Sequence, residues 1–212
     1  MPRTLIANGT VVTVDGARNV FPGGYVAIDG ARIAATGPAA QAPAPDGFDT
    51  VINAAGMIVV PGLINMHQHH WYTLFKGVAD GYLLEDWVTD ILLPLALKLD
   101  DEAMRVSSTV AGLEMLSTGT TCSFNHSVTT TTPSLVAASI EPQAALGIRQ
   151  VYAKEMRCRT PGNTRHPLGL NEALAAFDAD AASWNGTHDG IVRFGMALGT
   201  NAHWVAAVSS TE

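Results

Sequence analysis

Two histidines, His67 and His69, are the residues whose types and spacing most directly indicate chemistry. Side chains two positions apart on a β-strand point to the same face, so both imidazoles can reach one metal ion. Neutral imidazole is the commonest protein ligand of zinc and similar divalent ions. The apolar run before them is typical of a buried strand, and Pro61-Gly62 allows a local backbone distortion. This pattern predicts a metal-dependent hydrolase.

These histidines are expected at the end of a strand that positions them. The chain before this strand is expected to form a separate small domain. Short strands with turn signals are predicted between residues 4 and 60, with a turn at Asn8-Gly9. Asp29-Gly30 is expected to close a hairpin, because Asp-Gly between alternating runs is a strong hairpin signal. We therefore predict a small β-sandwich domain at residues 1–57.

Strands alternate with helices from residue 58 onward, a pattern typical of an α/β fold with a parallel sheet or barrel. Strands are predicted near residues 58–66, 119–125, 148–154 and 191–198. A helix at 101–117 begins with Asp100 as a cap and ends before Gly119, and a second helix is predicted at about 171–183.

Four predicted strands are half of what an eight-stranded (β/α) barrel requires, and such a barrel takes roughly 250 residues. We therefore expect residues 58–212 to be the N-terminal half of a (β/α)8 TIM-type barrel, incomplete in this chain. The active site of such a barrel lies at the C-terminal ends of its strands, which is where the two histidines fall. A catalytic zinc usually has three protein ligands and an open position for water, so at least one further ligand is required.

The segment from Val51 to Gly77 resembles the amidohydrolase superfamily. Within that superfamily, the chain is most similar to the branch that contains triazine hydrolases, guanine and 8-oxoguanine deaminases, and methylthioadenosine/S-adenosylhomocysteine deaminases. The motifs that carry the resemblance are Asn53-Ala54-Ala55-Gly56, Val60-Pro61-Gly62, His67-Gln68-His69, Lys76-Gly77, Leu84-Glu85-Asp86-Trp87, Thr118-Gly119-Thr120-Thr121 and Gly147-Ile148-Arg149.

The resemblance implies one zinc ion per active site, with iron as an alternative, held in part by His67 and His69. It also implies that the remaining ligands and the residue that shuttles protons lie beyond Glu212, so no catalytic residue is assigned in this chain. Three residues are candidates for substrate binding: Trp87, His126 and His203. Packing of Trp87 against a helix and a structural role for His126 stay open as alternatives. His70 is expected to be structural.

Departures from the pattern of the relatives bear on the substrate. Asn125 stands where relatives often have aspartate, Ala96 where nucleoside deaminases carry a glutamate, and Tyr72 where many base deaminases carry a glutamine. The substrate is therefore predicted only as a heterocycle such as a purine, pyrimidine or triazine. Lys154 is read as a surface or pocket-rim cation rather than as the modified lysine that bridges two metals in other relatives.

Three functions are open. The first is an aminohydrolase that attacks a ring carbon with metal-activated water. The second is a cyclic-amide hydrolase with a binuclear metal centre, and the third is a catalytically incomplete fragment.

The bulk composition is that of an ordinary enzyme, with 47% hydrophobic and 15% charged residues and a formal net charge of −7. An acidic balance without a basic cluster argues against nucleic-acid binding. No membrane association is expected, and without a secretion signal we predict a cytoplasmic protein with Cys122 and Cys158 reduced. The expected partners are a small-molecule substrate and, for the complete protein, further copies of itself.

Overall fold

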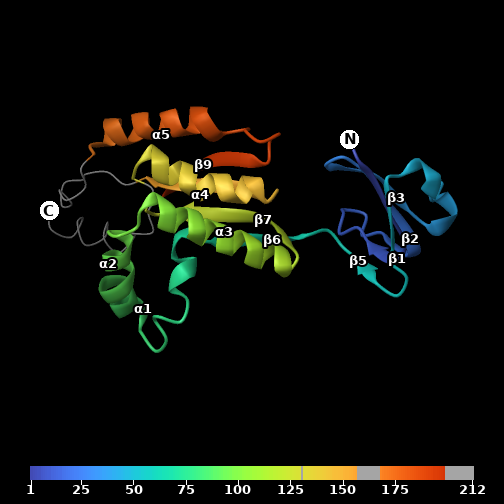
Figure 1. The fold of residues 1–212 in the computed structure, drawn as a ribbon, viewed down its shortest axis with the longest axis horizontal. Helices are drawn as coiled ribbons and strands as arrows, with labels where there is room; N and C mark the ends of the chain where they lie inside the picture. Colours follow the sequence, from blue (N-terminus) through green and yellow to red (C-terminus); the bar gives the residue numbers. More distant parts are fainter. Residues whose placement is uncertain (130, 157–167, 199–212) are drawn as a thin grey trace. The chain divides into compact units, whose positions relative to one another are not determined.

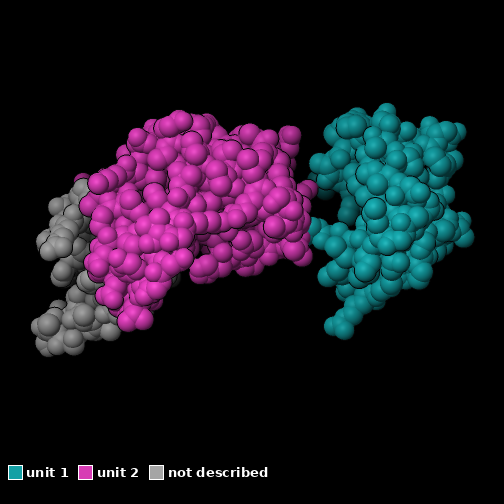
Figure 2. Space-filling model, turned by 60° about the horizontal axis from the view of Figure 1, so that its bottom comes forward, with its two compact units in different colours: residues 1–62 teal, residues 63–212 magenta. Residues whose placement is uncertain are grey.

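The computed structural model describes residues 1–129, 131–156 and 168–198. The chain divides into two compact units, residues 1–62 and residues 63–212 (Figure 2). The sequence places the domain boundary after residue 57, and the extents of the two domains stay a prediction. His203 and Cys158 lie outside the described residues, while Cys122 is a free cysteine.

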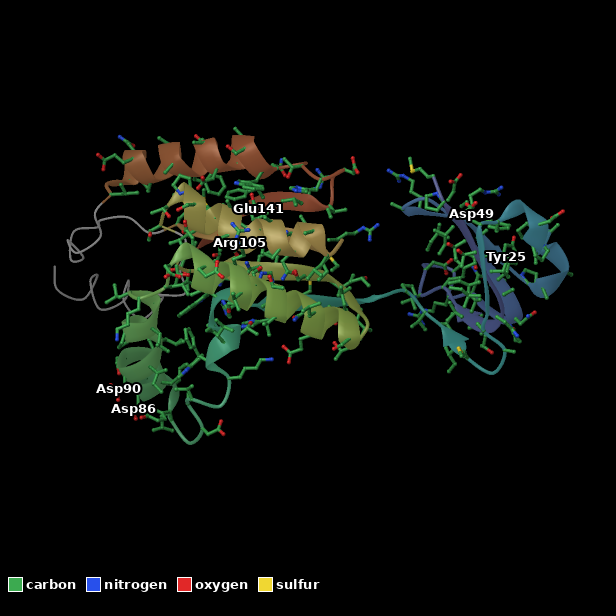
Figure 3. All side chains as sticks on the ribbon, viewed as in Figure 1. Tyr25, Asp49, Asp86, Asp90, Arg105 and Glu141 are labelled. Atoms are coloured by element: carbon green, nitrogen blue, oxygen red, sulfur yellow. The ribbon has the colours of Figure 1, made fainter. Side chains whose placement is uncertain are left out.

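The first unit is a mixed β-sheet with the strand order β3-β2-β1-β4, and a short β5 also pairs with β1 (Figure 1). Its elements are β1 (Arg3–Val12), β2 (Val20–Asp29), β3 (Arg32–Gly37), the 3-10 helices η1 (Ala39–Gln41) and η2 (Pro45–Gly47), β4 (Thr50–Asn53) and β5 (Ile58–Val59). The hairpin predicted at Asp29-Gly30 is confirmed, because β2 and β3 pair antiparallel and Gly30 has a φ of 56°. Leu5, Tyr25 and Ala27 form the buried core of this sheet, and Figure 3 shows where Tyr25 lies among the side chains of this unit.

The turn predicted at Asn8-Gly9 is wrong. β1 runs through these residues with a shift of register on either side of Gly9, and Asn8 has a φ of 67°. Asparagine tolerates this left-handed backbone, so the pair forms a bulge within one strand. A Cβ on Gly9 would lie 2.7 Å from Val59 Cγ2, which explains why a glycine stands where β5 approaches. Residues 1–62 show this one sheet, and the β-sandwich stays a prediction.

The second unit contains a four-stranded sheet in the order β6-β7-β8-β9, and every neighbouring pair is parallel. The strands are β6 (Leu63–Gln68), β7 (Thr120–Ser127), β8 (Arg149–Met156) and β9 (Val192–Leu198). The first strand differs from the predicted range, because residues 58 and 59 pair with β1 as β5. Pro61 has no backbone N–H to donate, so Pro61-Gly62 separates the two strands instead of distorting one.

Helices connect the strands and run alongside them (Figure 1). Between β6 and β7 lie the 3-10 helix η3 (His70–Phe75), α1 (Leu84–Asp86), the π-helix η4 (Trp87–Leu92), α2 (Leu93–Ala96) and α3 (Asp101–Ser117); α4 (Pro133–Ala145) and α5 (Leu170–Trp184) follow β7 and β8. The predicted helix at 101–117 is confirmed with its cap, since the Asp100 side chain accepts a hydrogen bond from the Ala103 N–H at 2.8 Å. The helix predicted at 171–183 is confirmed as α5.

Helix α4, which the sequence did not predict, contributes to two hydrophobic clusters in the described part of the second unit. One cluster joins Val136, Ile140 and Ala144 of α4 to Tyr152 and Val192 of the sheet. The other joins Leu135 and Ala138 to Trp71 and Met104. These contacts fix the helical layer against the parallel sheet, so the second unit has the α/β class that the sequence predicts.

No helix in the described part of the chain combines the length and the apolar character needed to cross a membrane.

Candidate metal centre

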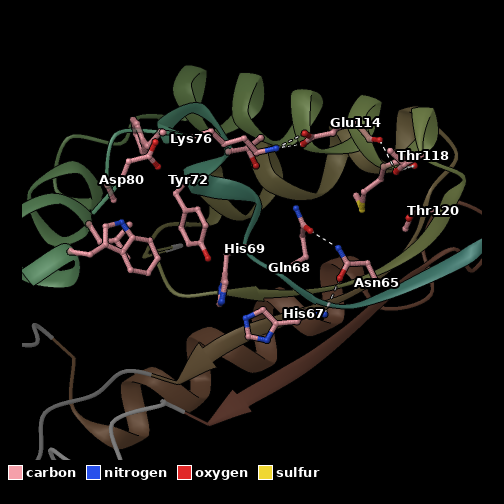
Figure 4. A pocket seen from close by; sticks show the side chains of 17 residues that line it. Asn65, His67, Gln68, His69, Tyr72, Lys76, Asp80, Glu114, Thr118 and Thr120 are labelled. Atoms are coloured by element: carbon pink, nitrogen blue, oxygen red, sulfur yellow. Dashed lines mark hydrogen bonds and ion pairs between the residues drawn. The ribbon is translucent and has the colours of Figure 1, made fainter. Parts of the chain in front are cut away.

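His67 and His69 lie at the carboxyl end of β6, and their side chains lie close together (Figure 4). Their ring centroids are 5.0 Å apart and the rings are nearly perpendicular. The last register pair between β6 and β7 is Gln68 with Asn125, so the two imidazoles stand where the ladder stops. The structure thus brings together the two residues predicted to be metal ligands.

The ring of His69 is oriented by the neighbouring strand. Its Nδ1 lies 2.8 Å from the main-chain oxygen of His126, and a carbonyl can only accept, so Nδ1 carries the hydrogen and donates it. The other ring nitrogen, Nε2, then has its lone pair free for a cation. Burial lowers the pKa of His69, which favours the neutral form that a metal ligand requires.

The side chain of His126 also lies beside the ring of His69. Its ring centroid lies 5.3 Å from that of His69, and its Nε2 lies 3.0 Å from Oε2 of Glu155. This is an ion-pair distance, although the two atoms are not aligned as a hydrogen bond. The side chains are 15% and 1% exposed, so Glu155 lies behind His126.

Sequence reasoning missed Glu155. His126 pairs with Ala153 in the β7–β8 register, and side chains alternate along a strand, so Glu155 shares the face of His126. Val151 and Ala153 make this face of β8 apolar up to Glu155, so a carboxylate at the next position of the same face is a signal that could have found it.

A groove of about 610 Å³ borders the two histidines, and both Tyr72 and Trp87 line it (Figure 4). The Tyr72 ring neighbours both His69 and Trp87. Its centroid lies 5.3 Å from that of His69 and 5.8 Å from that of Trp87. Trp87 therefore lines the same groove as the predicted metal ligands, and its contact with a substrate stays a prediction. Burial raises the pKa of Tyr72, so its hydroxyl remains a hydrogen-bond donor at neutral pH.

Lys154 is not the surface or pocket-rim cation that the sequence suggests. Its side chain is 12% exposed, and Nζ lies 2.5 Å from Oδ2 of Asp180 on α5. Lys154 is two residues from Tyr152, which packs against α4, so both point to the helical layer. The opposite face of the sheet holds His126 and Glu155.

Two of the side chains predicted to bind a zinc ion, those of His67 and His69, lie among the described residues. No group of three or more His, Cys, Asp or Glu side chains in residues 1–129, 131–156 and 168–198 is placed to hold a metal ion together. His67 and His69 nevertheless fit a zinc ion in chemistry, because they offer two neighbouring imidazoles and the orientation of one of them is fixed. His203, the third candidate substrate residue, lies outside the described residues.

Comparison with known proteins adds independent findings. The model of the Amidohydrolase family matches residues 58–206. A 5-methylthioadenosine/S-adenosylhomocysteine deaminase of Desulforudis audaxviator is 40% identical over 119 residues, 56% of this chain and 27% of the relative. A second 5-methylthioadenosine/S-adenosylhomocysteine deaminase, from Desulforamulus reducens, is 30% identical over 195 residues. These residues cover 90% of this chain and 41% of the relative.

Solved structures show the same fold. An atrazine chlorohydrolase of Arthrobacter aurescens TC1, complexed with zinc, superposes with a TM-score of 0.81 at 23% identity over 92% of this chain and 46% of its own. This chain therefore spans less than half the length of each of these three proteins.

Proposed function

Since this chain belongs to the amidohydrolase family, we propose that the complete protein is an aminohydrolase that acts on the carbon–nitrogen bond of a heterocycle. His67 and His69 hold one zinc ion, or an iron ion in its place. The observation that carries this proposal is the hydrogen bond from His69 Nδ1 to the His126 carbonyl, which leaves Nε2 for the metal.

A bound zinc ion lowers the pKa of a water molecule to about 7 and so supplies a nucleophile at neutral pH. Trp87 and Tyr72 form an aromatic corner at the groove, and aromatic faces suit flat heterocycles because stacking covers a large apolar area. His126 contacts the substrate from the other strand, with Glu155 behind it. In the overall reaction a carbon–oxygen bond replaces the carbon–nitrogen bond, and ammonia leaves.

We also propose that further strands complete an eight-stranded barrel over the second unit. β6 is an outer strand of the described sheet, and its apolar residues Leu63, Ile64 and Met66 are 59%, 64% and 66% exposed. The open edge of β6 has unpaired backbone groups, and a further strand would pair with them. The same strand and its neighbours would bury the exposed apolar side chains. The missing metal ligands and His203 belong to that completed site, and a second layer over the first unit would make the predicted β-sandwich.

The substrate class is a purine, a pyrimidine or a triazine, and homo-oligomerisation is expected for the complete protein. The alternative of a binuclear cyclic-amide hydrolase finds no support from Lys154, which is paired to Asp180 in the helical layer.

The test is an assay of ammonia release by the full-length protein from S-adenosylhomocysteine, guanine and an amino-substituted triazine. Treatment with a chelator should abolish activity, and one equivalent of zinc should restore it. Full activity in protein stripped of metal would remove the proposal. Two metal ions per site together with dependence on carbon dioxide would favour the binuclear alternative instead.

A further inference from the structure

Two neighbouring residues of β7, Asn125 and His126, hold the two residues that follow the β6 ladder, His69 and His70. The His126 carbonyl accepts from His69 Nδ1 at 2.8 Å. The Asn125 side-chain oxygen Oδ1 accepts from the His70 main-chain N–H at 3.1 Å. These bonds are separate from the strand pairing, which ends at Gln68 and Asn125. One bond orients the predicted metal ligand, and the other fixes the main chain directly after it.

Asn125 is itself fixed by the helical layer. Its side chain is buried, with 1% of the residue exposed, and its Nδ2 donates to Ser139 Oγ on α4 at 3.3 Å. The main-chain oxygen of Ser139 in turn accepts from Ser108 Oγ on α3 at 2.7 Å. An amide can donate and accept at the same time, so Asn125 connects His70 to α4 through one side chain.

His70 is held from a second direction as well. Its carbonyl accepts from Ser107 Oγ at 2.6 Å, and its Nδ1 lies 3.5 Å from Ser108 Oγ. Both main-chain polar groups of His70 are therefore bound by side chains, one from β7 and one from α3, and the residue is fully buried from solvent.

We propose that Asn125 is a positioning residue of the metal centre. By fixing the main chain at His70, its amide keeps the His69 ring on the His126 carbonyl and directs Nε2 to the metal. The inference rests on the proposed function only in that a metal binds at His67 and His69. Removal of an outer partner of a metal ligand typically weakens metal binding by about 10- to 100-fold. Asn125 acts through the main chain, so we expect about tenfold.

The chain offers a matched control on the same strand. Ser127 lies two residues from Asn125 on the same face, is 3% exposed, and accepts from the Tyr152 hydroxyl at 2.9 Å. Ser127→Ala removes a buried hydrogen bond of similar kind, but one that does not reach His69 or His70. Asn125→Asp keeps the acceptor for the His70 N–H and serves as the conservative variant.

The experiment measures zinc affinity of the full-length protein by competition with a chromophoric chelator, together with the thermal midpoint of each variant. Asn125→Ala should bind zinc about tenfold more weakly, while Ser127→Ala and Asn125→Asp stay within about twofold of wild type. If Asn125→Ala does not fold, Ser139→Ala, which removes only the anchor of Asn125, should weaken zinc binding about threefold.

Unchanged zinc affinity in Asn125→Ala, or in Ser139→Ala where the first variant does not fold, would overturn the inference and leave the proposed function intact. Equal weakening in Ser127→Ala would also overturn it, because the effect would then follow general stability. A wild-type protein that binds no zinc would overturn both.

Discussion

Asn125 and His126 are neighbours in the chain, yet they point to opposite faces of the parallel sheet and behave differently there. On the helical face, Asn125 is bonded to Ser139 of α4, and Lys154 is paired with Asp180 of α5. On the other face, the His126 side chain lies beside Glu155 and the ring of His69, which itself neighbours His67. Polar residues on the first face bind to helices, whereas those on the second face gather around one another.

This difference indicates that polar residues on the helical face stabilise the fold, whereas those on the other face are available for the reaction. A buried polar group normally costs free energy unless it is hydrogen-bonded, and the helical face meets this requirement through α3 and α4. On the other face, His126 and Glu155 are close but poorly aligned, and Nε2 of His69 is left for a ligand. Substitutions on the two faces should therefore have different consequences, and five predictions test this.

The largest effect is expected for His69→Ala, beside the face of the sheet that holds His126 and Glu155. Loss of a metal ligand should lower kcat/KM by about 10³-fold or more, equal to about 4 kcal/mol of transition-state stabilisation. Steady-state kinetics of the full-length protein measure this. The control is His188→Asn, since His188 is exposed and asparagine tolerates its φ of 53°. Comparable losses in both variants would contradict the assignment.

Gly112→Ala on α3 should destabilise the helical layer without loss of metal. The new Cβ would lie 2.5 Å from Leu146 Cδ1 and 2.9 Å from Gln143 Nε2, and such overpacking costs about 1–3 kcal/mol. Denaturant unfolding measures the cost. Gly195→Ala is the control, because no described atom beyond its chain neighbours lies within 4 Å of the new Cβ. A neutral Gly112→Ala would contradict the expected overpacking and show that the ends of Leu146 and Gln143 move aside without cost.

The buried His70 should make stability depend on pH. Burial lowers its pKa from 6.5 to about 3, so above pH 6.5 the ring is neutral in both the folded and unfolded states. Below pH 6.5 the His70 ring binds a proton in the unfolded chain but stays neutral in the folded state. The free energy of unfolding therefore falls as the pH drops towards 3. The loss between pH 7 and pH 5 is about 2 kcal/mol.

Comparison with His70→Gln isolates this contribution from those of other groups. Unfolding free energies at pH 7 and pH 5 should differ by about 2 kcal/mol more in wild type than in the variant. Equal pH dependence of the two proteins would mean that His70 is protonated when folded.

Trp87→Ala should affect substrate binding rather than metal or fold. The loss of one aromatic contact, worth about 0.5–1.5 kcal/mol, should raise KM by up to about tenfold with unchanged zinc content. Tyr72→Phe keeps the ring and removes only the hydroxyl, so it separates stacking from hydrogen bonding. If Trp87→Ala lowers stability without changing KM, Trp87 has the helix-packing role that the sequence left open.

The smallest effect is expected for Lys76→Gln. Lys76 pairs with Glu114, but the two side chains are 60% and 52% exposed, so water screens the pair. The free energy of unfolding should change by less than about 1 kcal/mol, measured by denaturant titration. A larger loss would mean that this side of the groove is less open to solvent than the structure shows.

Local patterns in the sequence predict much of the second unit. Asp100 as a cap, acidic residues in the first turn and Gly119 past the end define α3, and alternation with apolar strands defines the parallel sheet. His67 and His69 can be recognised because their spacing alone places them on one face. Such features depend on residues close in the chain.

The remaining features depend on contacts between distant segments. Helix α4 begins with Thr132 as a cap and Pro133 in its first turn, a readable signal, but Pro142 inside it obscures the helical pattern. The pairing of His126 with Glu155 requires the register of β7 against β8. The pairing of β5 with β1, rather than with the strands of the second unit, likewise depends on long-range contacts that no local pattern encodes.

The most direct test of the metal centre is zinc K-edge X-ray absorption of the full-length protein loaded with one equivalent of zinc. Imidazole nitrogens should appear at about 2.0–2.1 Å from the metal. His67→Ala and His69→Ala should each lose one imidazole contribution or release the zinc, while His188→Asn leaves the spectrum unchanged. Zinc spectra that are identical in wild type and both β6 variants would contradict the assignment of His67 and His69 as metal ligands.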